Sequence, residues 1–140
     1  MARTAVADVM TRRIVYLPGD TLLDEAAQAM RDQAIGDVVV TEGPTLSGMV
    51  TDRDIVVRAI AAGLPTRTTT LASIASRELI MIDQTATVEE AVQAMRDRDV
   101  RRLLVCDADR NLVGILSLSD VALLPTSAPQ TSTPGRARPT

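Results

Sequence analysis

An internal repeat restricts this chain to a fold built from two similar units. Residues 26–32 return as residues 91–97, with six of seven residues identical at an offset of 65. Residues 48–55 return as 114–121 at an offset of 66. Both copies contain a glycine, two apolar residues, a hydroxyl residue, two spacers, an aspartate and an aliphatic residue. Two such copies predict two supersecondary units that bury their apolar faces together.

Each unit has the same order of expected elements. Apolar residues at i, i+3, i+4 and i+7 predict one amphipathic helix per unit. Thr87 with Glu90 predicts a capping box at the second of these helices, and Thr21 with Asp24 a weaker one at the first. In order, we expect a helical turn (6–10; 71–75), a strand (14–17; 79–82), the amphipathic helix (from 23; from 88), a strand pair (38–41 with 46–50; 103–106 with 112–116) and a closing helix (52–62 in the first unit).

A β-α-β-β-α unit of this size covers only one face of its sheet with helices. Two units can bury the remaining faces against each other, which neither unit can do alone. The sequence therefore predicts an α+β fold of tandem repeats packed sheet to sheet with pseudo-twofold symmetry. We expect the first repeat at 1–64, the second at 65–125, and a disordered Pro-, Ser- and Thr-rich tail at 126–140.

The residue types that are missing exclude most catalytic and metal sites. The chain has no histidine and one cysteine, Cys106, so it lacks the commonest general base and the ligands of a structural zinc site. We expect Cys106 to be a small core residue, since its position falls within a strand. The sequence therefore predicts a protein that is not an enzyme, holds no metal and requires no cofactor.

The charge and hydropathy of the sequence argue against nucleic acids and membranes as binding partners. The formal charge is −3, and the only aromatic residue is Tyr16, which argues against nucleic-acid binding. The sequence contains no run of 18 apolar residues, so it predicts no membrane-spanning helix. The N-terminus also has no apolar segment typical of a signal peptide. With a single cysteine, the simplest expectation is a cytoplasmic protein that does not contact membranes.

The repeated motif falls where a strand passes into a helix. Backbone N–H groups at such a turn are unpaired and can hold an anion. Thr51 and Ser117 add a hydroxyl donor, and Asp54 and Asp120 offer carboxylates that can accept the two hydroxyl groups of a ribose. This combination favours a nucleotide site. The alternative interpretation is an ordinary helix cap, which needs no ligand.

These residues together resemble a CBS-domain pair, the cystathionine-β-synthase-type repeats also called a Bateman module. The resemblance rests on the two β-α-β-β-α units, each with its Gly-h-h-Thr/Ser-x-x-Asp-h motif, where h is an apolar residue, and covers about residues 4–124. The segment Leu46 to Pro65 is also similar to stand-alone actinobacterial pairs, including the hypoxic response protein group.

The resemblance implies a regulatory module that binds adenosine-containing ligands in two clefts between the repeats. It implies that Thr51 or Ser117 contacts phosphate or ribose and that Asp54 or Asp120 takes the ribose hydroxyls. Adenine would lie near the first strand of each repeat. The residues so implied at that strand are Ile14, Val15, Leu79 and Ile80. The resemblance also implies a homodimer and an effector protein, while the particular adenosine ligand, the dimer orientation and the effector stay open.

The two repeats differ at the start of their third element. Relatives of the AMP-activated protein kinase type carry a basic pair there that faces phosphate, which implies the same role for Arg101 and Arg102, with Arg102 the better match. The first repeat has Gly36 and Asp37 instead, and Asp37 would repel phosphate. We therefore expect two unequal sites, the tighter one beside Arg102. The arginine pair has an alternative interpretation as a solvated strand end, and the sequence leaves open which motif aspartate serves this site.

Two functions follow. The first is a module that senses adenosine nucleotides of the AMP, ADP and ATP class and signals to a partner protein. The second is a dimerisation scaffold whose clefts bind no ligand. Loss of Asp54 or Asp120 abolishes nucleotide binding under the first function, and changes only helix-cap stability, by about 1 kcal/mol, under the second.

Overall fold

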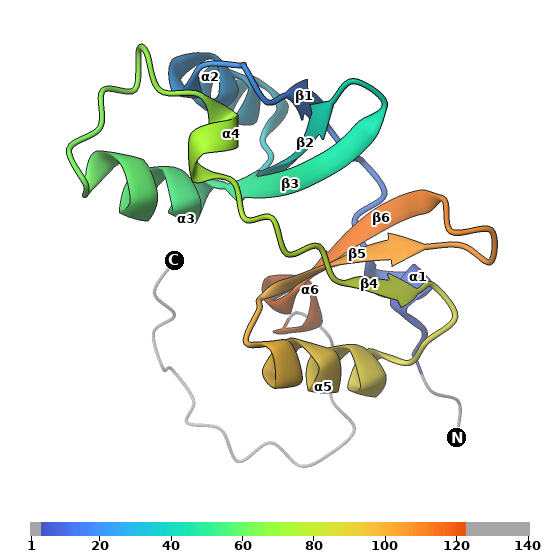
Figure 1. The fold of residues 1–140 in the computed structure, drawn as a ribbon. Helices are drawn as coiled ribbons and strands as arrows, with labels where there is room; N and C mark the ends of the chain where they lie inside the picture. Colours follow the sequence, from blue (N-terminus) through green and yellow to red (C-terminus); the bar gives the residue numbers. More distant parts are fainter. Residues whose placement is uncertain (1–3, 123–140) are drawn as a thin grey trace, which may run out of the picture.

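The computed structural model describes residues 4–122, which form two layers, each a three-stranded sheet with helices on its outer face (Figure 1). In each sheet the first strand is parallel to the middle strand, and the middle strand is antiparallel to the third. The strands are β1 (Tyr16–Pro18), β2 (Asp37–Glu42) and β3 (Thr45–Thr51) in one sheet, and β4 (Met81–Asp83), β5 (Arg102–Cys106) and β6 (Leu112–Ser117) in the other. The expected tail at 126–140 lies outside the described residues.

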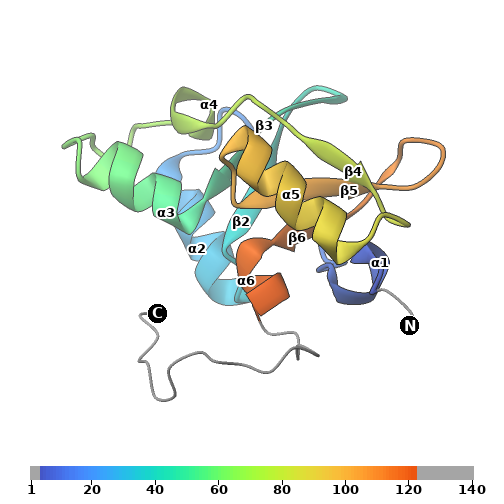
Figure 2. The ribbon, with the colours of Figure 1, turned by 90° about the horizontal axis from the view of Figure 1, so that it is seen from below.

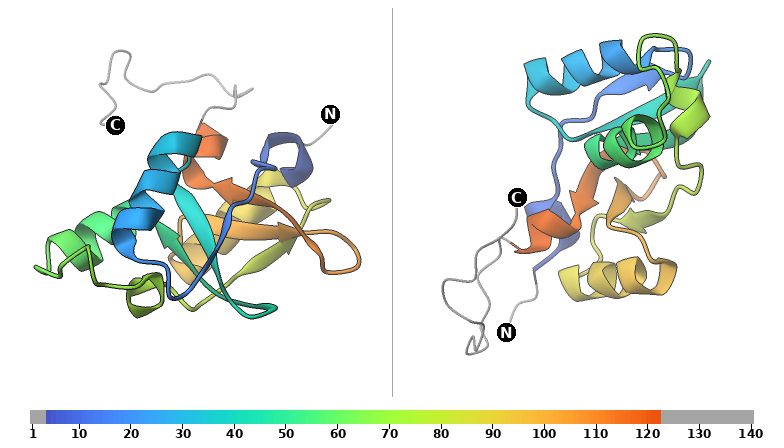
Figure 3. Two further views of the ribbon diagram at one scale, coloured as in Figure 1. Left: turned by 90° about the horizontal axis from the view of Figure 1, so that it is seen from above. Right: turned by 90° about the vertical axis from the view of Figure 1, so that its left-hand side faces the viewer.

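Helices cover the outer face of each sheet, as the edge-on view in Figure 3 shows. Figure 2 shows α5 lying across the outer face of the second sheet. The helices of the first layer are α2 (Leu23–Gln33), α3 (Asp52–Asp54), the π-helical η1 (Ile55–Ile60) that continues α3, and α4 (Leu71–Ile74); those of the second are α1 (Val6–Val9), α5 (Val88–Arg98) and α6 (Leu118–Ala122).

The inner faces of the two sheets pack against each other, as the sequence predicts. Val39 and Met49 of the first sheet form one buried cluster with Leu104 and Ile115 of the second. Two further cores lie between each sheet and its own helices. The α+β tandem repeat packed sheet to sheet is therefore confirmed, and aliphatic and methionine side chains fill its three core clusters.

The leading segment of each repeat crosses to the other layer. Val6 of α1 donates its backbone N–H to the carbonyl of Ala86 at 2.8 Å, and the equivalent Leu71 of α4 donates to Thr21 at 2.9 Å. Val6 and Leu71 are fully buried in the cores of the layers they reach. Each layer is thus completed by a segment of the other repeat, which ties the two together. The expected boundary between the two repeats, at residues 64 and 65, divides the sequence and stays a prediction.

The crossings explain why the first strands begin later than expected. Backbone hydrogen bonds join Thr11 to Ile115 in the second layer and Ser76 to Met49 in the first, in each case between segments of different repeats. The chain therefore passes from one layer to the other over residues 12–15 and 77–80. The expected strand starts at 14 and 79 were wrong, since β1 begins at Tyr16 and β4 at Met81.

Two local expectations need correction and one is confirmed. The capping box at Thr87 and Glu90 is present. The box expected at Thr21 and Asp24 is absent, because α2 begins one residue later and Glu25 accepts the backbone N–H of Leu22. The closing helix of the first repeat is α-helical only to Asp54 and then takes the wider π winding, with a bond from the N–H of Ala61 to the carbonyl of Val56.

Substituting Gly48 with alanine is expected to destabilise the fold where a crossing segment meets β3. A Cβ at Gly48 would lie 2.8 Å from the carbonyl oxygen of Ser76 and 3.0 Å from the Cβ of Ala75. Since Ser76 is held to β3 by its bonds to Met49, the backbone has to shift. We expect a loss of roughly 1–3 kcal/mol in urea unfolding. Thr45→Ala, on the exposed end of the same strand, is the control. A Gly48→Ala variant as stable as this control would contradict the close approach.

Candidate functional site

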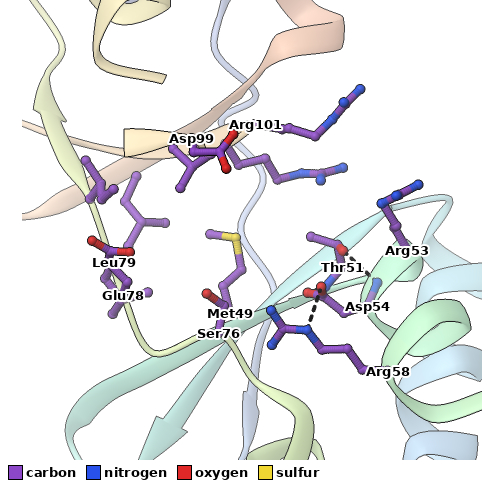
Figure 4. Close-up of a pocket in the computed structure, with 14 residues that line it drawn as sticks. Met49, Thr51, Arg53, Asp54, Arg58, Ser76, Glu78, Leu79, Asp99 and Arg101 are labelled. Atoms are coloured by element: carbon purple, nitrogen blue, oxygen red, sulfur yellow. Dashed lines mark hydrogen bonds and ion pairs between the residues drawn. The ribbon is translucent and has the colours of Figure 1, made fainter. Parts of the chain in front are cut away.

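A cavity of about 250 Å³ lies between the two repeats and is lined by side chains from both. Figure 4 shows Thr51 and Asp54 on one side, Glu78 and Leu79 on the other, and Asp99 and Arg101 at a third side. Its volume is just below the range of about 300–1,000 Å³ typical of small-molecule sites. The lining residues are Met49, Thr51, Arg53, Asp54, Arg58, Ser76, Glu78, Leu79, Ile80, Asp99, Val100, Arg101, Arg102 and Leu104.

Thr51 and Asp54 stand at the turn from β3 into α3. The Thr51 hydroxyl oxygen accepts the N–H of Asp54 at 3.0 Å, and Oδ2 of Asp54 accepts the N–H of Thr51 at 2.9 Å. The two side chains thus form a capping box, which is the ligand-free interpretation of the motif. Oδ1 of Asp54 lies 3.8 Å from Nε of Arg58, beyond hydrogen-bond length, so this oxygen can still accept a hydroxyl hydrogen bond. The Thr51 hydroxyl hydrogen is likewise available to donate.

An apolar wall faces this polar turn. Leu79 and Ile80 belong to the crossing segment, and the carbonyl of Ile80 accepts the N–H of Leu104 at 2.9 Å. Leu79 and Leu104 belong to the cluster between the sheets, and the Ile80 side chain packs against the core of the second layer. The wall is therefore fixed by packing on both sides, and it offers an aliphatic surface to a flat heterocyclic ring.

Two arginines at the start of β5 line the cavity, and they differ in what they contact. Nε of Arg102 donates to Oδ2 of Asp37 at 2.7 Å, across the boundary between the repeats. Among the residues that the structure describes, Arg101 forms no ion pair, and its side chain is exposed. The expected phosphate-facing residue, Arg102, is thus already bound to a carboxylate.

Asp37 is held in surroundings that disfavour its charge. Burial raises the pKa of Asp37, Arg102 opposes that rise, and the carboxylates of Asp120 and Asp52 add to it. The net direction is upward, so desolvation outweighs the attraction of the guanidinium.

The equivalent residues of the other motif lie away from this cavity. Ser117 and Asp120 form a capping box of the same kind, at 3.0 and 3.2 Å. Ile14 and Val15 occupy the other crossing segment, where Ile14 packs in the cluster between the sheets. The cavity therefore brings together six of the ten residues singled out in the sequence, with Asp54 as its motif aspartate. The other four are Ser117, Asp120, Ile14 and Val15.

Several lining residues carry charge and had been missed. Arg58 lies one helical turn after Asp54, a spacing that favours an ion pair and is visible in the sequence. Arg53 lies inside the repeated motif itself. Asp99 ends α5 in a left-handed conformation with φ of 55°, and only the turn from α5 into β5 brings it to the cavity. No sequence signal marks that position.

The two inter-packed β-α-β-β-α repeats define a class of protein. The family model described as "CBS domain" matches residues 6–60 and again residues 71–125. The chain therefore belongs to the CBS-domain family and is a tandem pair of CBS domains, as the resemblance implied. CBS-domain pairs are typically regulatory, ligand-binding modules.

Similar proteins span nearly the whole chain. CBS domain-containing protein YhcV of Bacillus subtilis is 35% identical over 120 residues, covering 86% of this chain and 84% of its own. Hypoxic response protein 1 of Mycobacterium tuberculosis is 35% identical over 120 residues, covering 85% of this chain and 83% of its own. A crystal structure of Hypoxic Response Protein I has a TM-score of 0.66 at 34% identity, covering 85% of this chain and 97% of the crystallised one. The expected similarity to the hypoxic response protein group is thus confirmed.

A more distant structure supports the fold alone. The hexameric CBS-CP12 protein from bloom-forming cyanobacteria has a TM-score of 0.79 at 22% identity, covering 88% of this chain and 68% of that one. In this chain, the residues from 4 to 122 contain no helix long and apolar enough to cross a membrane.

The Hypoxic Response Protein I crystal structure is described with two coordinated zinc ions, and the side chains of this chain do not fit such a centre. The sequence has no histidine. Its one cysteine, Cys106, is buried with its Sγ 3.6 Å from the carbonyl of Ile82. Within residues 4–122, no three His, Cys, Asp or Glu side chains are grouped to hold a metal ion.

Proposed function

We propose that this CBS pair is a regulatory module that senses adenosine nucleotides of the AMP, ADP and ATP class and signals their presence to a partner protein. One observation carries the proposal. A single cavity joins the hydroxyl and carboxylate of Thr51 and Asp54, from one repeat, to an aliphatic wall and an arginine pair from the other. These are the three kinds of contact that a nucleotide needs.

Each part of a nucleotide has a matching surface. Adenine lies against Leu79 and Ile80, since an aliphatic wall buries a flat ring without requiring an aromatic residue. Asp54 accepts the ribose hydroxyls through Oδ1, the oxygen outside the capping box. The phosphate takes the side of Thr51 and the arginines, whose charge-assisted bonds are the strong ones. The small volume favours a mononucleotide.

We assign the chain no catalytic role, because nothing in the cavity pairs a nucleophile with a base. The lining offers carboxylates, arginines and the hydroxyls of Thr51 and Ser76, and no histidine or cysteine. Nucleotide binding is instead coupled to the relative position of the two repeats, since the ligand contacts both. A partner protein that reads that position receives the signal.

Thermal unfolding with millimolar adenosine, AMP, ADP, ATP, NAD and S-adenosylmethionine tests this function. A ligand at about 100 times its dissociation constant stabilises the fold by roughly 2.7 kcal/mol, a rise in Tm on the order of 5–10 °C for a domain of this size. A rise with one nucleotide class supports the sensor. The absence of any rise would reject it.

A second candidate is a dimerisation scaffold with no ligand in its clefts. It is favoured by the two capping boxes, in which Thr51 with Asp54 and Ser117 with Asp120 satisfy each other without a ligand. Under this function every nucleotide leaves Tm unchanged while self-association persists. The thermal panel therefore separates the two candidates.

Both candidates include a homodimer, and an exposed apolar helix face supports one. Val56, Val57 and Ile60 of η1 are 54%, 48% and 58% exposed, and Leu64, four residues after Ile60, is 39% exposed. Four large aliphatic side chains in a row leave an unusual amount of apolar surface in water. A second copy of the same face would cover it about a twofold axis.

Ile60→Glu is expected to dissociate that dimer, because a carboxylate at the most exposed of these positions would lose its hydration in the interface. We expect the dimer dissociation constant, measured by sedimentation velocity, to rise at least about tenfold, equivalent to about 1.4 kcal/mol. Gln28→Glu, on the exposed side of α2, adds the same charge elsewhere and should leave the dimer intact. Equal dimer stability in both variants would place the interface on another surface.

A further inference from the structure

We propose that Asp37 is an internal competitor for the ligand phosphate: it holds the Arg102 guanidinium at the margin of the cavity, and a phosphate gains Arg102 only by displacing Asp37. This inference rests on the proposed nucleotide function and names the residue that sets its selectivity for phosphate. The phosphate of the nucleotide then has to carry enough negative charge to displace Asp37 from Arg102.

The pairing is a consequence of the repeat. Asp37 and Arg102 stand 65 residues apart and occupy the same position in their repeats, the first residue of β2 and of β5. Equivalent positions that lie close to a pseudo-twofold axis meet across it, and here the two residues carry opposite charges. Their 2.7 Å contact is the only ion pair between the sheets within residues 4–122.

The position and the burial of the Arg102–Asp37 pair mean that a ligand phosphate competes with Asp37 for Arg102. Arg102 lines the cavity, whereas Asp37 is not among the lining residues, so the carboxylate draws the guanidinium toward the edge of the cavity. The side chains are only 24% and 20% exposed, which limits the screening of either charge by solvent. A phosphate in the cavity therefore meets Arg102 only at close range, with Asp37 as its rival.

The pair is also suited to exchange. Asp37 lies near two further carboxylates, Asp52 of α3 and Asp120 of α6. Their repulsion and the desolvation of Asp37 weaken its hold on Arg102, in agreement with the raised pKa of Asp37. A doubly charged phosphate monoester presents more negative charge than one carboxylate, and it is the stronger partner for a guanidinium.

The other arginines of the cavity set the affinity for an anionic ligand that does not displace Asp37. Arg53 and Arg101 also line the cavity, and neither forms an ion pair within the part of the chain that the structure describes. They attract any anionic ligand without displacement of Asp37. Arg102 then adds its contact only for a ligand that can displace the carboxylate, so Asp37 lowers the affinity for phosphate-bearing ligands and leaves the affinity for the bare nucleoside unchanged.

Asp37→Asn tests this inference because it removes the charge and keeps the shape. Titration calorimetry with AMP and with adenosine gives two dissociation constants per variant. We expect Asp37→Asn to tighten AMP on the order of tenfold and to leave adenosine within about twofold. Asp99→Asn is the matched control. It removes a carboxylate from the lining of the same cavity, at a left-handed position that asparagine tolerates, whereas the side chain of Arg102 is paired with Asp37.

A double-variant cycle ties the effect to Arg102. In an Arg102→Met background, Asp37→Asn should no longer change AMP affinity, because the contested cation is gone. Asp37→Ser replaces Asp37→Asn if the latter does not fold. Asp37→Asn binding AMP no tighter than the wild type, or tightening adenosine equally, would overturn the inference. Asp99→Asn tightening AMP as much would do so as well.

The outcomes separate this inference from the nucleotide function itself. If the wild type binds AMP and Asp37→Asn binds it equally, the sensor stands and the competition falls. If only Asp37→Asn binds AMP, the competition stands and the wild-type chain is not an AMP sensor. If neither binds AMP or adenosine, both proposals fall.

Discussion

Replacing Asp54 with alanine is expected to abolish the nucleotide-dependent rise in Tm. Asp54 is the motif aspartate that lines the cavity between the repeats, and its Oδ1 is outside the capping box and can accept a ribose hydroxyl. Loss of the ribose contact should raise the dissociation constant by at least about a hundredfold, since charge-assisted bonds to two hydroxyls contribute roughly 1.5–3 kcal/mol each. At a fixed millimolar concentration the rise of 5–10 °C then falls below about 2 °C.

Asp120→Ala is the matched control for this experiment. It breaks a capping box with the same two hydrogen bonds, so both variants lose about 1 kcal/mol of stability without ligand. Asp120 does not line the cavity, and its variant should keep the nucleotide-dependent rise. The opposite pattern, with the rise lost only in Asp120→Ala, would move the site to the other cleft. A rise retained in both variants would contradict the assignment of the motif aspartates.

Leu71→Ala is expected to cause the largest loss of stability, because Leu71 belongs to the second sequence repeat and is buried in the core of the first layer. Its side chain is fully buried beside Leu23 and Ala26 of α2. Truncation leaves a cavity and should cost about 2–5 kcal/mol in urea unfolding. The loss should appear as one cooperative transition, since the segment joins both layers.

The control for this variant lies on the same connecting segment. Arg67→Ala truncates an exposed side chain and should change the unfolding free energy by less than about 0.5 kcal/mol. A Leu71→Ala chain as stable as Arg67→Ala would contradict the exchange of leading segments. Two separate transitions would mean that each sequence repeat folds without the other.

The repeat allowed much of the fold to be predicted. Amphipathic periodicity placed α2 and α5, the duplication implied sheet-to-sheet packing, and the uncovered apolar faces gave the physical reason for it. The motif also indicated Thr51 and Asp54, because a hydroxyl and a carboxylate at a strand-to-helix turn are local features. Local periodicity does not reveal which layer a segment joins. The crossing of α1 and α4, and with it the late start of β1 and β4, therefore had no signal in the sequence.

The contact between Arg102 and Asp37 likewise could not be predicted from the sequence. Both residues were visible as a difference between the repeats, and Asp37 was expected to repel phosphate at the equivalent spot. Their 2.7 Å contact depends on the pseudo-twofold axis bringing equivalent positions together, which is a property of the packed pair. The choice of Asp54 over Asp120 for this cavity depends on the same packing. The sequence shows that Asp37 and Arg102 carry opposite charges, but only the packing of the two repeats shows that they are in contact.

The central proposal is that a nucleotide binds between the repeats, and methyl NMR of the Leu, Ile, Val and Met side chains tests it most directly. On addition of AMP, we expect chemical-shift changes at Leu79, Ile80 and Met49, which line the cavity. The methyl groups of Ile14 and Val15, in the other crossing segment, should change much less. Saturable changes confined to the first group would support a nucleotide site there. Unchanged spectra with AMP, ADP and ATP, or changes confined to Ile14 and Val15, would contradict it.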